Sequence, residues 1–129
     1  MSRAIAALLL LVATSVGALA QSLPVPSQWT SQDHSYLEFD QMVSSAEFVG
    51  DFVDHNPNFA CANFMHKLSG FVHGAKVTFS VYWWQEGPAQ CGETSWTGHV
   101  SGSTITAHWV HTVKGSPNTY GTDTFTRHR

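Results

Sequence analysis

The sequence has little charge and little cationic character. Only 12% of its 129 residues are charged, and six Lys and Arg stand against nine Asp and Glu, for a formal net charge of −3. No two Lys or Arg residues are consecutive. Because a basic stripe is what holds a nucleic acid or an anionic membrane surface, we exclude both as partners. With 12% aromatic residues and so few charges, the chain is expected to form one compact domain.

Long apolar runs are lacking as well, with one exception at the N-terminus. Residues 4–13 are all apolar, they follow Arg3, and the small-residue pattern Ala18-Leu19-Ala20 comes soon after them. This arrangement is typical of a secretory signal peptide, and the run is too short to span a membrane, which takes about 20 residues. We therefore expect residues 1–20 to be cleaved near Ala20, residues 21–129 to form the mature domain, and the protein to be secreted or periplasmic.

Cysteine is scarce, since Cys61 and Cys91 are the only two. If they form a disulfide, only one connectivity is available. An oxidising compartment favours the bonded pair over two free thiols, and closing this loop would contribute roughly 3–4 kcal/mol in the chain-entropy model. A metal site built on them is disfavoured, because no Cys-x-x-Cys spacing is present.

Helical periodicity is hard to find in the mature sequence, whereas alternation of period two is frequent. Seven turn signals rich in Gly, Pro, Asn and Ser separate eight alternating segments. The expected strands cover residues 28–31, 35–41, 46–53, 65–73, 76–84, 93–100, 103–112 and 119–127. Short links favour an antiparallel meander, and eight such strands commonly close into a barrel. The predicted fold is an all-β, eight-stranded, antiparallel up-and-down β-barrel with room inside for one small ligand.

Alternation also predicts which side chains point into the barrel. The inward sets combine aromatic rings with a few hydroxyls and carboxylates: Ser35, Leu37 and Phe39; Phe48, Gly50, Phe52 and Asp54; Thr94, Trp96 and Gly98; Ala107, Trp109 and His111; and Gly121, Asp123 and Phe125. Apolar walls with few placed polar groups are typical of a small-molecule pocket. A plain packed core with its carboxylates in solvent fits the same alternation, so the pattern alone leaves both readings open.

The segment 76–84 ends in aromatic residues on both faces. Val77, Phe79, Val81 and Trp83 share one face, whereas Tyr82 and Trp84 lie on the other. An outward pair of aromatic rings on a small barrel indicates a surface for a partner. Scattered surface aromatics are the alternative.

Four motifs, taken in order, resemble successive motifs of the avidins, which are secreted biotin-binding β-barrels. The motifs are Trp29-Thr30-Ser31-Gln32-Asp33-His34-Ser35, Leu68-Ser69-Gly70, Ser95-Trp96-Thr97-Gly98-His99 and Gly121-Thr122-Asp123-Thr124-Phe125-Thr126. Each motif is weak alone, but their order and spacing are specific, and the resemblance runs from about Gln28 to Arg129. It implies a protein that is not an enzyme and that holds biotin non-covalently, as a bound ligand rather than a cofactor.

The cysteine pair resembles that of the short dimeric avidins. In that group a disulfide joins the loop between the third and fourth strands to the loop before the Trp-Thr-Gly strand. Cys61 and Cys91 stand at the matching places. Tetrameric avidins also carry a tryptophan in the loop between the last two strands, and residues 112–120 contain none. The resemblance therefore implies a Cys61–Cys91 disulfide and a homodimer.

The resemblance further implies roles for single residues. Phe79, Trp96 and Trp109 match the aromatic side chains that clasp the bicyclic ring of biotin. Asp123 matches the carboxylate that accepts a hydrogen bond from a ureido N–H group. Thr94 matches the hydroxyl that meets the ring sulfur.

The residues expected around the ureido oxygen depart from the family pattern. Ser35 matches the family's serine, but Ser31 stands where an asparagine is usual, and Phe52 stands where a tyrosine would donate a hydrogen bond. Asp54 replaces a small hydroxyl or amide residue beside the second ureido N–H, and Gly92 replaces a serine near the tail carboxylate. Each lost donor to a buried oxygen costs about 1–3 kcal/mol, so we expect a lowered affinity for biotin.

Three other functions fit parts of the sequence. An avidin-like barrel for a different ligand, with a cationic or donor-rich head, would suit two inward carboxylates. An enzyme is disfavoured because the chain has no Gly-x-Ser-x-Gly or His-Glu-x-x-His motif. A metal-dependent enzyme is disfavoured as well, because His108 and His111 face opposite sides of one strand and cannot jointly ligate a metal. A purely structural protein would need neither Asp123 nor Thr94 on an inward face.

Overall fold

The computed structural model describes residues 22–83 and 91–129, and within them it contains only β-strands and connecting loops. The strands are β1 (Ser27–Ser31), β2 (Tyr36–Met42), β3 (Glu47–Val53), β4 (Met65–His73), β5 (Lys76–Tyr82), β6 (Glu93–Ser101), β7 (Thr104–Thr112) and β8 (Thr119–Arg127). No helix capable of crossing a membrane is found in this part of the chain.

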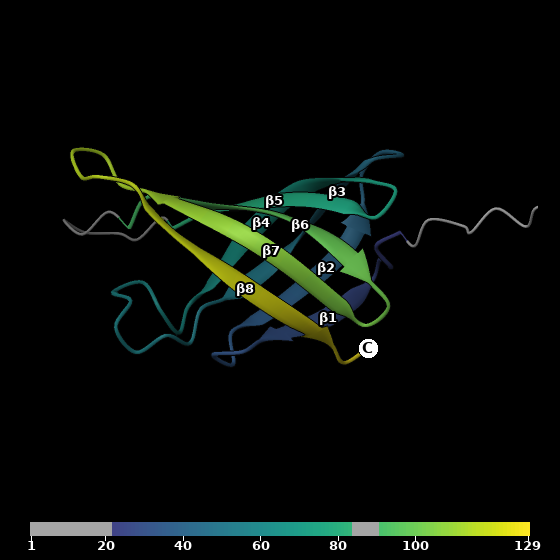
Figure 1. Cartoon of the computed structure of the whole chain (residues 1–129), viewed down its shortest axis with the longest axis horizontal. Coiled ribbons are helices and arrows are strands. Elements are labelled where there is room, and N and C mark those ends of the chain that lie inside the picture. The colour runs from purple at the N-terminus through teal and green to yellow at the C-terminus, as the bar shows by residue number, and fades with distance from the viewer. Residues whose placement is uncertain (1–21, 84–90) are drawn as a thin grey trace, which may run out of the picture.

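Each strand pairs antiparallel with the next, and β8 pairs with β1 to close the barrel (Figure 1). The prediction of an eight-stranded up-and-down barrel is therefore confirmed. Every predicted strand is present, and its ends agree with the structure to within one residue, except at the end of β5. That strand stops at Tyr82, and Trp84 lies outside the described residues. The predicted signal peptide, residues 1–20, also lies outside them and stays a prediction.

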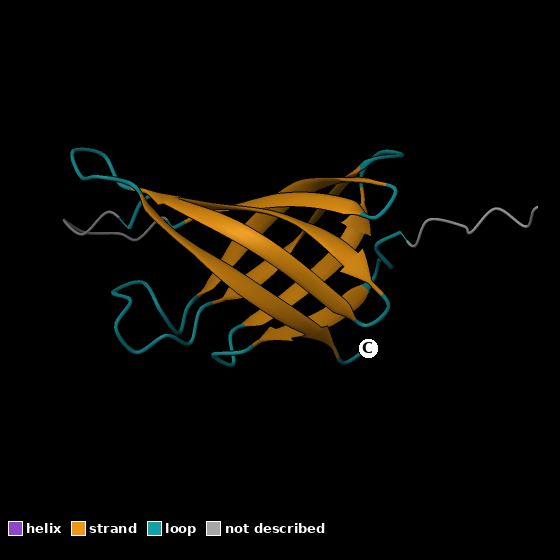
Figure 2. Cartoon of the chain, in the orientation of Figure 1, coloured by secondary structure: helices purple, strands orange, loops and turns teal. Residues whose placement is uncertain are grey.

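Several connections gather at one end of the barrel, which we call the mouth (Figure 2). Among the described residues they include the β1–β2, β3–β4 and β7–β8 loops, as the up-and-down order requires. The loop between β3 and β4, residues 54–64, lies at the mouth, whereas the C-terminus lies at the other end. Anything bound inside the barrel near the mouth is therefore bordered by these described loops.

The barrel interior is filled by the side chains that alternation assigned to it. Phe48 and Phe52 of β3 are buried, and so are Thr94 and Trp96 of β6. Phe39 packs edge-to-face on Phe48 and Phe79, with ring centroids 4.8 and 5.5 Å apart. The inward faces predicted from period-two alternation are thus the buried faces of the strands.

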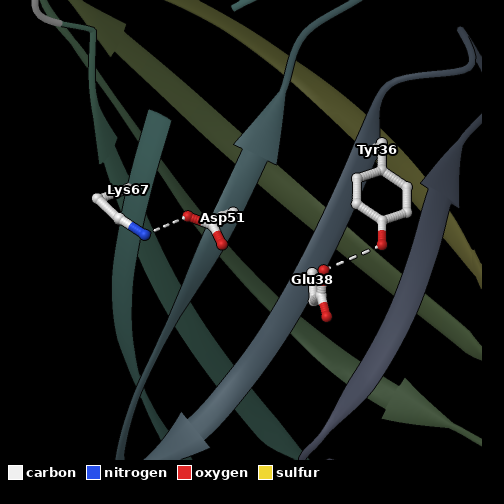
Figure 3. A network of polar contacts seen from close by, with 4 residues as sticks. All are labelled: Tyr36, Glu38, Asp51 and Lys67. Atoms are coloured by element: carbon white, nitrogen blue, oxygen red, sulfur yellow. Dashed lines mark hydrogen bonds and ion pairs between the residues drawn. The ribbon is translucent and has the colours of Figure 1, made fainter. Parts of the chain in front are cut away.

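The outer face of β2, β3 and β4 carries a group of polar contacts (Figure 3). Tyr36 Oη donates to Glu38 Oε2 at 3.1 Å, and Lys67 Nζ pairs with Asp51 Oδ1 at 2.8 Å. A β-bulge between Phe39 and Gln41 shifts the register of β2 against β3. Because a bulge adds one unpaired residue, it re-aims the side chain of Asp40, which hydrogen-bonds to Asp51 on this face.

Candidate ligand-binding site

A cavity of about 130 Å³ lies within the barrel near the mouth. Five of the residues predicted to bind a ligand line it: Asp54, Thr94, Trp96, Trp109 and Asp123. Asp33, Asn56, Phe59, Trp83 and His111 complete the lining. His111 shares the inward face of Trp109 by alternation, and its position at the cavity agrees with this prediction. The other predicted site residues, Ser31, Ser35, Phe52 and Phe79, are buried around the cavity without lining it.

Trp96 forms part of the cavity wall, and two phenylalanine rings stack against it. Phe52 stacks on it with a centroid distance of 5.0 Å and an interplanar angle of 26°. Phe79 stacks on it as well, also at 5.0 Å, with an angle of 13°. Phe79, predicted as a wall, therefore supports the wall from behind, and its direct contact with a ligand stays a prediction.

Trp83 supplies a wall that the sequence reasoning did not assign. Its indole Nε1 donates to Thr94 Oγ1 at 2.8 Å, and its ring meets Phe52 edge-to-face at 5.6 Å. A signal for it was present, because Trp83 continues the inward face of Val77, Phe79 and Val81 by one more step. The resemblance had assigned the aromatic role on that strand to Phe79.

The carboxylate of Asp123 is oriented by two donors. Trp96 Nε1 donates to Asp123 Oδ2 at 2.7 Å, and Gln32 Nε2 donates to Asp123 Oδ1 at 2.9 Å. Gln32 is itself fixed, because its Oε1 accepts from the backbone N–H of Thr124 at 2.8 Å. The β1–β2 loop thus helps to aim a half-buried carboxylate of β8 at the cavity.

The two serines predicted to donate to the ligand instead form hydrogen bonds with Asp33 of the protein. Ser31 Oγ donates to Asp33 Oδ1 and accepts from the backbone N–H of Ser35 at 3.1 Å. The Ser35 hydroxyl also hydrogen-bonds to Asp33, and it accepts from the backbone N–H of His55 at 3.0 Å. Partial burial acts to raise the pKa of Asp33, but the bonds from Ser31 and Ser35 outweigh it and hold that pKa below its usual value.

Asp54 is a second acidic group on the lining. Its Oδ1 accepts from the backbone N–H of Asn56 at 2.7 Å. Burial raises the pKa of Asp54, and the neighbouring charges of Asp33 and Asp123 raise it further. Sequence reasoning had paired Asp54 with Asp123 alone, because a turn residue such as Asp33 has no face that alternation can assign.

The β3–β4 loop is fixed over the cavity by an aromatic contact and a crosslink. Phe59 packs edge-to-face on Trp83 at 5.0 Å and on His111 at 5.6 Å. The expected disulfide joins Cys61 of this loop to Cys91, and His111 Nε2 donates to the Cys91 carbonyl. The β3–β4 loop is therefore tied to the residues just before β6, beside the cavity.

Two glycines are required by this geometry. Gly92 has a φ of +69°, and a Cβ there would lie 2.0 Å from the Thr112 carbonyl oxygen, so a serine cannot take its place without a shift of the backbone. A Cβ on Gly121 would lie 2.3 Å from the Trp109 ring, so the missing side chain gives that indole its position.

The polar groups of the site do not form a metal centre. Within the described residues, no three His, Cys, Asp or Glu side chains are arranged to hold a metal ion. The arrangement instead suits a small organic ligand, with aromatic walls and oriented polar groups at one end.

Comparison with known proteins identifies the family. No protein-family profile and no curated protein sequence matches the chain. Among solved structures, unliganded bradavidin2 is 31% identical over 81% of this chain and 98% of its own, with a TM-score of 0.68. Unliganded shwanavidin is 29% identical over 83% of this chain and 98% of its own, with a TM-score of 0.75.

A third similar structure is the complex of rhizavidin with biotin. It is 26% identical over 82% of this chain and 93% of its own, with a TM-score of 0.70. The identity to bradavidin2 extends over nearly all of that protein and over most of this one. The motifs, the closed barrel and these matches agree, and the chain belongs to the avidin family.

Proposed function

We propose that the chain binds biotin non-covalently in the cavity near the mouth. The observation that carries the proposal is the cavity itself, in which the rings of Trp83, Trp96 and Trp109 surround an oriented polar end. Two relatives of the same fold, bradavidin2 and rhizavidin, are solved as complexes with biotin. We propose that the protein binds its ligand and catalyses no reaction on it.

Each part of biotin has a matching group in the cavity. The bicyclic ring would lie between the indoles, which bury a large area with little loss of side-chain entropy. Asp123, held by Trp96 and Gln32, would accept a hydrogen bond from a ureido N–H. Thr94 Oγ1 accepts from Trp83 and keeps its own hydrogen for the ring sulfur.

The tail of biotin would leave the cavity past the β3–β4 loop. Asn56 lines the cavity on this side, and Phe59 packs over the nearby wall formed by Trp83. Backbone and side-chain donors between residues 54 and 61 would meet the tail carboxylate. Since the Cys61–Cys91 disulfide fixes this loop before binding, less ordering is needed when the ligand arrives.

We propose that biotin is held less tightly than a complete set of donors would allow. The hydroxyls of Ser31 and Ser35 bind Asp33, and Phe52 offers no donor. Asp54 adds a carboxylate, and Gly92 has no side chain for the tail. A missing donor to the buried ureido oxygen alone is expected to weaken binding by about 5- to 150-fold, which corresponds to about 1–3 kcal/mol.

We also propose that the mature protein is secreted or periplasmic and forms a homodimer. The apolar run at residues 4–13 ahead of Ala20 supports export. Exposed aromatic side chains on the outer face of neighbouring strands support a contact between copies, since Tyr82 is 61% and Phe71 is 58% exposed. N-terminal sequencing of exported protein should begin near Gln21, and light scattering should give twice the mass of one chain. An uncleaved N-terminus or a monomeric mass would contradict these two proposals.

A calorimetric titration of the mature, oxidised protein with biotin tests the main proposal. We expect saturation at one biotin per chain together with a change in tryptophan fluorescence. Asp123→Ala should weaken binding at least about 10-fold, because it removes a charged acceptor. Asp40→Asn, which alters a carboxylate on the outer face, is the matched control and should bind as the parent does. A titration without heat and without a fluorescence change would exclude biotin.

A second candidate function is the binding of a different small ligand in the same cavity. It is favoured by the three carboxylates on the lining, Asp33, Asp54 and Asp123. Biotin is neutral at its ureido end, so a cationic head group would complement these charges better.

A further inference from the structure

Three carboxylates converge on the polar end of the cavity from separate parts of the barrel. Asp33 comes from the β1–β2 loop, Asp54 follows β3 and Asp123 lies on β8. They are close enough that the charges of Asp33 and Asp123, after the larger effect of burial, raise the pKa of Asp54. A ligand head at this end therefore meets a negative potential.

Cationic side chains do not balance this potential. No lysine or arginine of the described residues lines the cavity. The nearby bases are two histidines. His55 follows Asp54 in the chain and acts to lower its pKa, and His111 donates to the Cys91 carbonyl. The charges of the three aspartates are thus left without a permanent counter-ion.

Four hydrogen-bond donors around this end already have partners within the protein. The Ser31 and Ser35 hydroxyls bind Asp33. The indole N–H groups of Trp96 and Trp83 donate to Asp123 and Thr94. A ureido oxygen needs donors, and to reach the two serines it must first displace the carboxylate of Asp33. That exchange leaves a carboxylate without its partners, which disfavours a neutral head with a carbonyl oxygen.

Acceptors, by contrast, remain available. Asp54 Oδ1 accepts from the Asn56 backbone, and no hydrogen bond from the described residues reaches Asp54 Oδ2. Trp96 and Trp109 present ring surfaces to the same cavity. A head that carries only N–H donors and positive charge would satisfy the carboxylates and stack on these rings.

We propose that the polar end of this cavity selects a planar, cationic, donor-rich head, a guanidinium or an amidinium, over a neutral ureido group. The inference rests on the proposed function, since it concerns the head-group end of the same cavity. A substituted guanidinium has up to five N–H donors and no acceptor, so it requires none of the occupied donors. It pairs with carboxylates through parallel hydrogen bonds, and its face is attracted to an indole ring. A metal ion is not an equivalent occupant, because no three ligating side chains in the described residues are arranged for one.

The experiment compares two probes that differ only at the head. Biotin carries a ureido oxygen, whereas 2-iminobiotin carries an imino nitrogen there and is a guanidinium cation at neutral pH. Both are titrated calorimetrically into the mature, oxidised protein at pH 7.5 and low salt. We expect iminobiotin to bind at least about 10-fold more tightly than biotin, the size of effect that one charge-assisted hydrogen bond provides.

Three variants test whether the aspartates of the cavity cause the preference for iminobiotin over biotin. Asp33→Asn keeps the size of the side chain, removes its charge, and should lower the affinity for iminobiotin relative to that for biotin at least about 10-fold. Asp54→Asn should act in the same direction and serves as a second test if Asp33→Asn folds poorly. Asp40→Asn, on the outer face, removes an equal charge away from the cavity and should leave the ratio of the two affinities unchanged.

The possible outcomes separate this inference from the proposed function. Tighter binding of biotin than of iminobiotin overturns the inference and leaves biotin binding in place. Binding of iminobiotin alone supports the inference and rejects biotin as the ligand. Failure of both probes to bind rejects both proposals. If Asp33→Asn and Asp54→Asn change the affinity ratio no more than Asp40→Asn does, the acidic end does not select the head.

Discussion

Trp83 combines two contacts that bear on ligand binding. Its indole N–H fixes the hydroxyl of Thr94, and its ring receives the edge of Phe59 from the β3–β4 loop. Phe79 of β5, which precedes Trp83, makes neither contact, because it lies against Trp96 and Phe39 in the core. The two residues therefore have different roles: Trp83 shapes the cavity, whereas Phe79 stabilises the barrel.

Substitutions at these two positions should separate binding from stability. Trp83→Phe removes the bond to Thr94 and part of the wall, so biotin affinity should fall about 10- to 100-fold. Phe79→Leu should reduce the free energy of unfolding by roughly 1–2 kcal/mol and change affinity by less than about 3-fold. Biotin titration and urea unfolding measure the two effects. A larger loss of affinity for Phe79→Leu than for Trp83→Phe would indicate that Phe79 contacts the ligand directly.

Single residues could be predicted from the sequence where they stand on strands. Thr94, Trp96, Trp109 and Asp123 were placed inward by alternation alone, and all four line the cavity. Asp33 could not be found in this way, because its place depends on hydrogen bonds from Ser31 and Ser35 and not on a strand face. Period two fixes the side of a strand residue, but a loop residue is placed by whatever other segments hold the loop.

At the scale of the strand, β2 contains a β-bulge that the turn signals in the sequence did not predict. Turn residues marked the ends of β2 to within one residue, but no glycine or proline marks its bulge. The bulge brings Asp40 against Asp51, which is paired with Lys67 (Figure 3). Burial, the hydrogen bond to Asp51 and the charge of Glu38 raise the pKa of Asp40 to about 6. Between about pH 4 and pH 6, Asp40 on the outer face therefore keeps a proton that an isolated aspartate would have lost.

Asp40→Asn should change how stability depends on pH. The folded-state pKa of Asp40 lies above its ordinary value of 3.8, so its contribution is present in full below about pH 4 and is lost as the pH rises through about 6. The parent should lose stability over this window relative to Asp40→Asn, which has no proton to release. Because Asp40 is only half-buried, we expect the difference at pH 8 to be about 1 kcal/mol or less. Urea unfolding from pH 4 to pH 8 measures it, and parallel curves for the two proteins would contradict it.

At the scale of the whole molecule, a closed barrel is combined with a mouth that is crosslinked. Pairing of β8 with β1 leaves the sheet without free edges, so the strands hold one another in place. Among the described residues, the β3–β4 loop at the mouth has no such ladder. The β3–β4 loop is held instead by Phe59 and by the Cys61–Cys91 disulfide, which spans 30 residues of sequence. The crosslink should therefore both stabilise the fold and keep the loop over the cavity ordered before the ligand binds.

Replacement of both cysteines by serine tests these two roles together. The free energy of unfolding should fall by roughly 3–4 kcal/mol, because the unfolded chain regains the freedom of a 30-residue loop. Biotin affinity should fall about 5- to 10-fold, mainly through faster dissociation, since the loop over the cavity must then be ordered on binding. Wild-type protein kept under reducing conditions is the matched control and should behave in the same way. A loss of stability with unchanged dissociation would mean that Phe59 and its contacts with Trp83 and His111 are sufficient to hold the loop, and that the disulfide acts on folding alone.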